Sequence, residues 1–301
     1  MKNKFETILD QDRILLDEPM KKHTTFRLGG PADYFLSPSD VNQIPEIIHI
    51  CRKEGIPWFV LGNGSNLLVS DQGYRGVVIQ IYKNMNQITV EGTRIYAQAG
   101  ALLSAVSKKA MEAGLTGMEF ASGIPGTLGG AAVMNAGAYG GEMKDILVSV
   151  TVLTDEGEQK VLKAEELSLG YRTSIIKERG YIVLDVVLQL QAGDQDAIRN
   201  RMEELKVQRV TKQPLEYPSA GSTFKRPEGY FAGKLIEDSG LKGYRLGGAQ
   251  VSEKHCGFVI NRDHATADDL YRLFQYIKDV VKEKFQVDME LEVELIGEFQ
   301  K

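Results

Sequence analysis

Two glycine-rich segments of this 301-residue chain contain residues suited to holding a negatively charged group. Residues 123–130 (GIPGTLGG) set four glycines around one proline, and residues 61–66 (LGNGSN) follow the apolar run 58–61. Such a loop can adopt positive φ and lets another group approach the main chain closely. Its N–H groups can form a concavity for an anion, and Thr127 or Leu128 would open a helix whose N-terminus also favours negative charge. The two loops together predict a long cofactor with two phosphates.

Neither residues 61–66 nor the later glycine segment at residues 229–235 fits the two commonest nucleotide-binding motifs. The dinucleotide-binding GxGxxG motif requires a third glycine where this chain has Leu67, and the residues after it have no helical pattern. The phosphate-binding motif needs four residues between its glycines and a hydroxyl after its lysine. Residues 229–235 have three and then Leu235. The sequence therefore indicates a nucleotide cofactor held in a different α+β framework.

Composition and charge exclude several classes of protein. The formal net charge of −5, without any basic cluster, argues against nucleic acid as a partner. No apolar run approaches the length of a membrane span, and residues 1–10 are too polar for a signal peptide. Only Cys51 and Cys256 are present, without CxxC spacing, which predicts free thiols in a reducing cytoplasm. The four histidines show no metal-ligand spacing, so no metal site is expected.

The elements that must position the loops follow from hydrophobic periodicity. A length of 301 residues favours about two domains, and a shift of composition at residues 192–195 predicts a domain boundary. Helices are expected at residues 37–54, 102–113, 196–209, near 231–238, and after a capping box formed by Thr266 and Asp269, with a partly helical leader at 1–22. Strands are expected at residues 33–36, 58–61, 76–81, 88–97, 148–154, 158–162, 181–190 and 287–296, and residues 169–175 are also strand-like.

The order of the motifs resembles the UDP-N-acetylenolpyruvoylglucosamine reductase family. The matching blocks are TTFRLGGPA, LGNGSNLLVSD, GIPGTLGGAAVMNAGAYG, GYRTS, PSAGSTFKRP, LIEDSGLKGYRLGGAQVSEKHCGFVIN and ELEVELIG. They occur in order from about Thr24 to Gly297, so the resemblance covers nearly the whole chain. The chain length and the interval between residues 210 and 225 resemble the second, shorter type of this family.

This resemblance implies a fold, a cofactor and a reaction. The implied fold is α+β, an FAD-binding fold of the vanillyl-alcohol oxidase type made of two subdomains (residues 1–81 and 82–193), followed by a substrate-binding domain (residues 194–301). FAD would be bound noncovalently, and NADPH would supply the hydride from within the substrate's own site. The implied reaction is reduction of the vinyl ether of a UDP-sugar to UDP-N-acetylmuramate for peptidoglycan. The resemblance indicates no obligate protein partner.

The resemblance also implies three catalytic residues. Reducing a vinyl ether that carries a carboxylate requires a cation on the carboxylate and a proton donor. Arg172 matches the family's arginine, which suits a carboxylate because a guanidinium binds it with two hydrogen bonds. Ser222 matches the proton-donating serine, with Lys225 as a candidate cationic neighbour. Glu292 matches the catalytic glutamate. Alternation places Glu290, Glu292 and Glu294 on one strand face, so periodicity alone does not choose among them, and the family usually has arginine where this chain has Glu294.

The remaining implied positions bind cofactor or substrate. Cofactor contacts, mainly through main-chain amides, fall on Gly62, Asn63, Gly64, Ser65, Asn66, Gly123, Ile124, Gly126, Thr127 and Gly130, with the side chain of Arg209. Substrate contacts fall on Tyr171, Lys225, Gln250, His255 and Asn261. NADPH has no motif of its own.

Two other interpretations stay open from the sequence. The first is another flavoenzyme of the same fold, such as an oxidase of an alcohol or sugar. Many of these tether flavin through His or Cys, and no His or Cys lies between Arg52 and Lys254. The second is a binding module without catalysis, against which the joint presence of Arg172, Ser222 and Glu292 argues.

Overall fold

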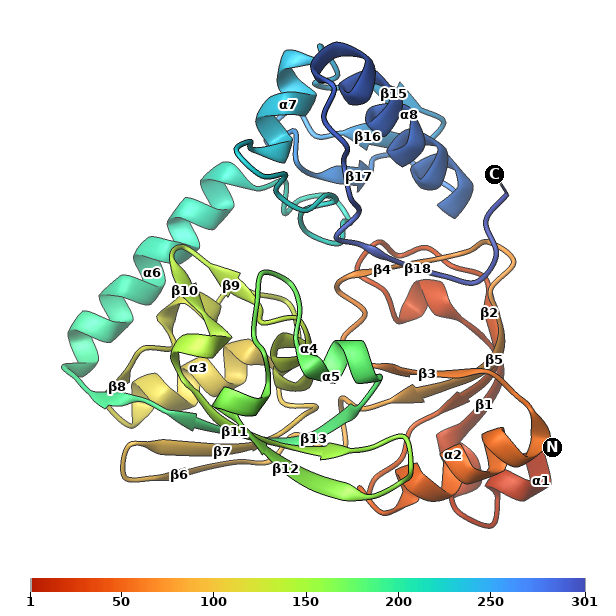
Figure 1. Cartoon of the computed structure of the whole chain (residues 1–301), viewed down its shortest axis with the longest axis vertical. Coiled ribbons are helices and arrows are strands. Elements are labelled where there is room, and N and C mark those ends of the chain that lie inside the picture. The colour runs from red at the N-terminus through yellow and green to blue at the C-terminus, as the bar shows by residue number, and fades with distance from the viewer. Residues whose placement is uncertain (1, 301) are drawn as a thin grey trace. The chain divides into compact units, whose positions relative to one another are not determined.

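A computed structural model describes residues 2–300 of the chain, which form two units. Unit 1 contains residues 2–15, 35–63 and 78–209, and unit 2 contains residues 16–34, 64–77 and 210–300. Three strands belong partly to each unit: β1 (Ile14–Pro19), β2 (Pro31–Leu36) and β5 (Tyr74–Gln80). With β3 (Trp58–Leu61) they form a four-stranded sheet in the order β1-β2-β5-β3. Helices and strands are mixed in both units, which confirms the α+β class (Figure 1).

The main sheet of unit 1 has five antiparallel strands in the order β12-β11-β13-β7-β6. These strands are β6 (Ile88–Glu91), β7 (Arg94–Gln98), β11 (Leu147–Leu153), β12 (Gln159–Lys163) and β13 (Ile182–Gln189). Alternate residues of β13 are buried, namely Leu184, Val186 and Leu188, whereas Asp185 and Val187 are partly exposed. Helices α3 (Leu103–Glu112) and α4 (Leu128–Val133) lie on the same side of this sheet (Figure 1). The predicted pairing of β11 with β12 is confirmed.

The other elements of unit 1 are short apart from two helices. The long helices are α2 (Gln43–Glu54) and α6 (Gln195–Lys212), the last three residues of which belong to unit 2. The short elements are α1 (Lys2–Phe5), η1 (Gln11–Arg13), β8 (Leu115–Thr116), η3 (Glu119–Ala121), β9 (Gly137–Ala138), β10 (Gly141–Glu142), η4 (Met143–Asp145), η5 (Ala164–Glu166), α5 (Ile175–Arg179) and β14 (Gln191–Ala192).

Three predicted elements of unit 1 are wrong in extent. The helix expected from residue 37 begins at Gln43, because the Gln43 side-chain oxygen accepts hydrogen bonds from the N–H groups of Ser39 and Asp40 and holds them in a turn. The leader at residues 1–22, expected to be partly helical, is helical in its described residues only in α1, η1 and η2 (Met20–Lys22), and the strand β1 lies between η1 and η2. The single strand expected at residues 88–97 is the hairpin β6–β7, since Gly92 has φ 59° and reverses the chain there.

Unit 2 combines a small antiparallel sheet with two helices. The sheet has the order β15-β16-β17, formed by β15 (Arg245–Leu246), β16 (Ala249–Val251) and β17 (Val259–Asn261). The helices are α7 (Ala232–Asp238) and α8 (Ala267–Phe285), and η2 (Met20–Lys22) is a single turn. The strands β4 (Leu67–Val69) and β18 (Glu294–Ile296) pair in parallel.

The start of α8 follows the predicted capping box. The Thr266 hydroxyl oxygen accepts a hydrogen bond from the Asp269 N–H at 3.0 Å, and the Asp269 carboxylate accepts one from the Thr266 N–H at 3.0 Å. The Asp71 carboxylate accepts two more, from the N–H groups of Ala267 and Asp268. These acceptors satisfy the free N–H groups of the first turn and place negative charge where the helix dipole favours it.

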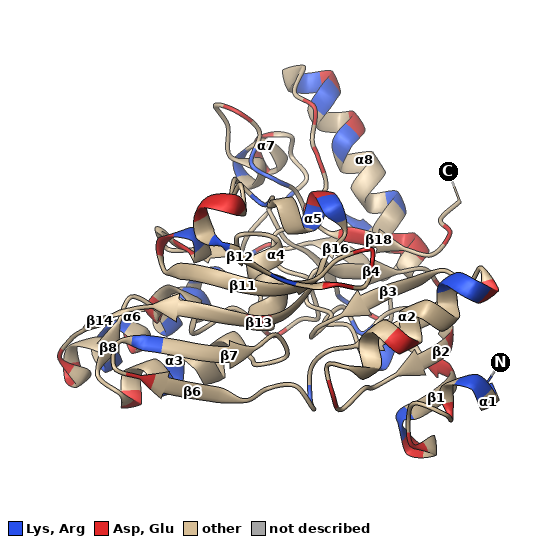
Figure 2. Cartoon of the chain, turned by 60° about the horizontal axis from the view of Figure 1, so that its bottom comes forward, with Lys and Arg blue, Asp and Glu red and all other residues tan. Residues whose placement is uncertain are grey.

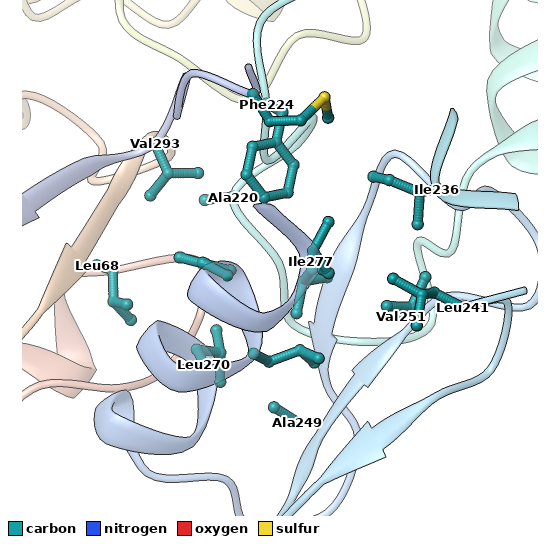
Figure 3. Close-up of a cluster of buried hydrophobic side chains, with 14 of the residues drawn as sticks. Leu68, Ala220, Phe224, Ile236, Leu241, Ala249, Val251, Leu270, Ile277 and Val293 are labelled. Atoms are coloured by element: carbon teal, nitrogen blue, oxygen red, sulfur yellow. The ribbon is translucent and has the colours of Figure 1, made fainter. Parts of the chain in front are cut away.

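The core of unit 2 is centred on the buried face of α8. Leu270 and Ile277 of α8 share one cluster of buried side chains with Phe224 and Val293 (Figure 3). The Phe224 and Phe274 rings meet edge to face with centroids 6.2 Å apart. Burying each such large apolar side chain contributes roughly 1.5–3 kcal/mol. This core fixes the main chain on both sides of Phe224 and Val293.

The strand predicted at residues 287–296 is wrong for most of its length. Only Glu294–Ile296 forms the strand β18, and Leu291 makes an isolated antiparallel bridge with Phe224. The alternation that suggested a strand is nevertheless present. Met289 and Val293 are buried, whereas Glu290 and Glu294 are exposed.

Charges of both signs are mixed along the visible elements, and acidic and basic residues alternate along α8 (Figure 2). Between residues 2 and 300 the structure holds no helix that is both long and apolar enough to cross a bilayer. The same residues contain no cluster of three His, Cys, Asp or Glu side chains that could hold a metal ion.

Candidate active site

The glycine-rich loop of unit 1 leads directly into helix α4, as predicted. Thr127 caps α4, with its hydroxyl oxygen 3.4 Å from the N–H of Gly130. The loop is fixed by three main-chain hydrogen bonds. The Ile124 N–H donates to Ala121, the Leu103 N–H donates to Gly126, and the Leu128 N–H donates to Ala101. Asn63 adds a side-chain bond from Nδ2 to the Pro125 carbonyl at 2.6 Å. Residues 62–63 and 123–130 therefore lie side by side within unit 1.

Close approach, and not positive φ, explains the glycines of this loop. None of Gly123, Gly126, Gly129 and Gly130 has positive φ, so that part of the prediction is wrong. A Cβ at Gly62 would lie 2.5 Å from the Thr127 Oγ1, and a Cβ at Gly123 would lie 2.9 Å from the Arg209 Nη1. Both contacts are shorter than a real Cβ allows, so a larger residue would displace the Thr127 hydroxyl at Gly62 and the Arg209 guanidinium at Gly123.

Arg209, near the end of α6, points a guanidinium nitrogen at the glycine loop. Its Nη1 is buried, and no residue between 2 and 300 accepts a hydrogen bond from it. Burial lowers the pKa of this guanidinium, and the neighbouring Tyr139 acts in the opposite direction. A buried cation without an acceptor is costly, and an anion beside Gly123 would supply the acceptor. The residues of this loop thus fit a phosphate-bearing cofactor.

Arg172 occupies a tight turn, whereas its segment was expected to be strand-like. Gly170 and Thr173 exchange main-chain hydrogen bonds at 3.1 and 3.5 Å, which leaves Tyr171 and Arg172 at the tip of the turn. Arg172 has φ 57°, in the left-handed region that non-glycine residues rarely adopt. Its guanidinium carbon lies 5.2 Å from the centre of the Tyr171 ring. The turn presents a cation and a half-exposed aromatic ring together.

Two buried polar side chains hold the ends of this turn. Asn135, which follows α4, donates from Nδ2 to the Gly170 carbonyl at 3.0 Å. Ser174 donates from its hydroxyl to the Val133 carbonyl at 2.6 Å. Asn135 is not among the site residues predicted from the sequence. Its position shortly after the glycine loop, in MNAGAYG, was the available signal, because Asn combines a donor and an acceptor with tolerance of positive φ.

In unit 2, the second glycine loop continues from Gly64 to Asn66. Gly64 has φ 62°, and a Cβ there would lie 1.9 Å from the His23 carbonyl oxygen. The Gly64 carbonyl accepts a hydrogen bond from the Thr25 N–H at 3.1 Å, and Ser65 links this glycine to Asn66. The Thr25 hydroxyl is buried, and no residue in the described part of the chain bonds to it. Each glycine loop thus has a buried polar atom beside it without a hydrogen-bond partner among the described residues: the Thr25 hydroxyl at residues 64–66 and the Arg209 nitrogen at residues 123–130.

Ser222 and Glu292 belong to two paired segments of unit 2. The Glu292 N–H donates to the Thr223 carbonyl at 2.9 Å, and the Lys225 N–H donates to the Glu290 carbonyl at 2.9 Å. Thr223 is fully buried and its hydroxyl oxygen accepts from the Val259 N–H at 3.0 Å. The half-exposed Ser222 precedes Thr223 directly. The structure thus brings these two predicted residues together on neighbouring segments.

Asn66 binds the segment that carries Glu292. Its Nδ2 donates to the Glu292 carbonyl at 2.9 Å, and its own carbonyl accepts from the Glu294 N–H at 2.9 Å. Asn66 was predicted to contact the cofactor; here its side chain holds the Glu292 carbonyl and its main chain holds the Glu294 N–H, so it fixes the chain on both sides of Val293.

The predicted substrate residues of unit 2 differ in their availability. Lys225 forms an ion pair with Glu290 at 3.1 Å, so the cation expected beside Ser222 is shared with an acidic neighbour. The Gln250 amide is buried and donates to the Gly243 carbonyl at 3.0 Å. The Asn261 amide donates to the Phe26 carbonyl at 3.1 Å and accepts from the Ala265 N–H at 3.0 Å.

The imidazole of His255 lies close to two glycines of unit 2. A Cβ at Gly257 would be 2.9 Å from its Cε1, and one at Gly233 would be 3.4 Å from the same atom. Its Nδ1 accepts the Gly257 N–H at 3.1 Å, and desolvation lowers the pKa of the ring. The side chain is therefore neutral near pH 7 and still partly open to solvent.

Comparison with known proteins places both halves of the chain. Residues 32–163 match an FAD binding domain, and residues 213–296 match the UDP-N-acetylenolpyruvoylglucosamine reductase C-terminal domain. The reductase of that name from Alkaliphilus oremlandii is 55% identical, with 97% of this chain and 96% of the relative covered. The one from Clostridium botulinum strain Okra is 53% identical, with 98% and 96% covered. The crystal structure of the Thermus caldophilus enzyme matches with TM-score 0.82 and 38% identity over 95% of this chain and 99% of that one.

Proposed function

This chain belongs to the UDP-N-acetylenolpyruvoylglucosamine reductase family, and on that premise we propose that it reduces the enolpyruvyl group of UDP-N-acetylglucosamine enolpyruvate to give UDP-N-acetylmuramate. Its cofactor is FAD, and NADPH is the hydride donor. The proposal is carried by one observation, the pairing that sets the Ser222 segment against the Glu292 segment. A protein that only binds its ligand has no need of a serine and a glutamate on two paired segments.

The chain's own residues fit the cofactor. Main-chain groups of residues 62–63 and 123–130, with the Arg209 guanidinium, would hold it in unit 1. Residues 64–66 with the Thr25 hydroxyl would hold it in unit 2. Bound in this way, FAD would supply the hydride chemistry that links NADPH to the substrate's vinyl group.

Arg172 supports the carboxylate of the substrate in this proposal. Hydride addition at the terminal carbon pushes negative charge into the carboxylate. A guanidinium binds a carboxylate with two parallel hydrogen bonds and keeps its charge at any physiological pH. The Gly170–Thr173 turn fixes the main chain at Arg172, so only its side chain has to be ordered when the substrate binds.

Ser222 delivers the proton that the adjacent carbon needs. A serine hydroxyl is a weak acid, so it transfers a proton only when another group replaces that proton or stabilises the oxygen left behind. Glu292 lies on the paired segment, and we assign it this supporting role. Lys225 contributes less positive charge than expected, because Glu290 shares its ammonium group.

The residues proposed to contact the substrate are those whose side chains remain accessible to solvent. Tyr171, Lys225 and His255 keep solvent-accessible side chains and are the preferred contacts for the UDP-sugar. Gln250 and Asn261 use their amides inside unit 2, so we give them supporting roles. The division into residues 1–81, 82–193 and 194–301 is retained as part of the proposal. The reaction needs neither nucleic acid nor a protein partner, and the two free cysteines agree with a cytoplasmic location.

Separate measurement of the two half-reactions tests this proposal. In Ser222→Ala and Glu292→Gln, we expect NADPH to bleach the flavin at a near-normal rate. Return of the flavin colour on adding the enolpyruvyl substrate should slow by at least roughly 100-fold. Ser219→Ala, in the same loop, is the matched control and should behave as the unaltered protein. Equal losses in both half-reactions would contradict the assigned roles.

A further inference from the structure

The Arg172 turn depends on a residue that lies well before it in the chain. Asn135 is 1% exposed and has φ 44°, a left-handed conformation that asparagine tolerates. Its amide nitrogen makes two hydrogen bonds, to the Gly170 carbonyl at 3.0 Å and to a Glu142 carboxylate oxygen at 2.9 Å. Its amide oxygen accepts the Lys144 N–H at 2.9 Å. The donors and acceptor of one side chain are thus all engaged.

The bonds of Asn135 affect the electrostatic surroundings of the Arg172 guanidinium as well as the main chain of the turn. The Glu142 carboxylate also accepts from the Lys144 ammonium at 3.0 Å, and the nearby positive charge of Arg172 helps to lower the pKa of Glu142. Asn135 therefore fixes both the first carbonyl of the turn and the carboxylate whose field reaches the guanidinium. An amide suits this place because aspartate has no N–H for Gly170 or Glu142, and glutamine is one carbon longer.

We propose that Asn135 is the positioning residue for Arg172, and that its amide sets where the guanidinium meets the substrate carboxylate. The inference rests on the role of Arg172 proposed above. The segment after the glycine loop would then affect the rate of substrate reduction, separately from any contact of the loop with the cofactor. Asn135 itself acts only through the Gly170 carbonyl and Glu142.

Two substitutions separate positioning from folding. Asn135→Ala removes all three bonds. Asn135→Asp keeps an acceptor for Lys144 and tolerates positive φ, but loses both N–H donors. In both variants we expect NADPH to reduce the flavin within about twofold of the normal rate. Reoxidation by the enolpyruvyl substrate should slow by roughly 10–100-fold, the usual cost of a small misplacement. Ser107→Ala in α3 is the control. It removes one hydrogen bond of an equally buried side chain, from the Ser107 hydroxyl to the Met118 carbonyl at 3.0 Å.

A double substitution supplies the decisive readout. If Asn135 acts through Arg172, Asn135→Ala should cost nothing further in reoxidation rate when Arg172 is already alanine. The same 10–100-fold loss in that background, or a normal reoxidation rate in both Asn135 variants, would overturn the inference. A normal rate in Arg172→Ala alone would instead refute the proposed role of Arg172. The two failures are therefore distinguishable.

Discussion

Arg172 sits in a backbone conformation that costs stability, and this cost can be measured. Its φ of 57° places the Cβ close to the following carbonyl oxygen, which costs a non-glycine residue roughly 1–2 kcal/mol. Arg172→Gly relieves that strain, while the added freedom of glycine in the unfolded chain takes back about 0.4–1 kcal/mol. Arg172→Ala loses the same guanidinium and keeps the strain. We therefore expect Arg172→Gly to exceed Arg172→Ala in stability by roughly 0.5–1 kcal/mol.

The assay is thermal unfolding of the two variants at one fixed FAD concentration, since bound ligand raises the Tm. For a chain of 301 residues, at roughly 2.1 cal/mol/K of unfolding entropy per residue, the difference corresponds to roughly 1–2 °C in Tm. Both variants should be slow in flavin reoxidation by the enolpyruvyl substrate, by roughly 100–1,000-fold, because both lack the cation. A Tm of Arg172→Gly equal to or below that of Arg172→Ala would refute the strained turn. Arg172→Lys, which keeps a charge, should recover only part of the rate because it lacks the two-pronged geometry.

Four further outcomes follow from the same structure. Arg209→Ala should weaken FAD binding roughly 10–100-fold in a flavin fluorescence titration, and unchanged affinity would remove it from the cofactor site. Asn66→Ala should slow flavin reoxidation more than it weakens FAD binding, because its amide holds the Glu292 carbonyl; loss of FAD alone would return it to a purely cofactor role. Desolvation lowers the pKa of His255 below its ordinary 6.5, so the unfolded chain binds its proton more readily. The contribution of neutral His255 to the free energy of unfolding is then complete above pH 6.5 and declines as the pH falls below that value. In urea unfolding from pH 5 to 8, the free energy of unfolding of His255→Gln should therefore depend less on pH than that of the unaltered protein. An unchanged pH dependence would contradict this. Burial raises the pKa of Cys51 to about 11, so Ellman's reagent should label it only after denaturation, and rapid labelling of the native protein would contradict its burial.

Elements with strong local signals are predictable from this sequence. The strand at 58–61 is an apolar run with β-formers, and α8 begins at a Thr266–Asp269 capping box. In both cases the residues that determine the element lie within it. The glycine loop with its Thr127 cap is of the same kind.

Elements that depend on distant partners are not predictable in this way. The segment around Glu292 alternates like a strand, but it bridges to Phe224 and bonds to Asn66, which no local pattern reveals. The turn at Arg172 has neither Gly nor Asn at its left-handed position, so its sequence looks strand-like. The fixed points of that turn are Asn135 and the Val133 carbonyl.

The residues of the site also differ in whether a sequence motif or only the structure reveals them. Family motifs locate Arg172, Ser222, Glu292 and Arg209. The structure adds Thr25, and it shows that the Thr25 hydroxyl and the Arg209 Nη1 are buried without a hydrogen-bond partner among the described residues. An unsatisfied buried atom has no sequence signature, because it is defined by what surrounds it.

The most direct test of the proposed function is an anaerobic absorbance titration of the purified protein. The flavin spectrum should bleach with NADPH and return rapidly when UDP-N-acetylglucosamine enolpyruvate is added, with formation of UDP-N-acetylmuramate. Bleaching without return would contradict the proposed acceptor. Failure to bind FAD at all would contradict the assignment of both glycine loops.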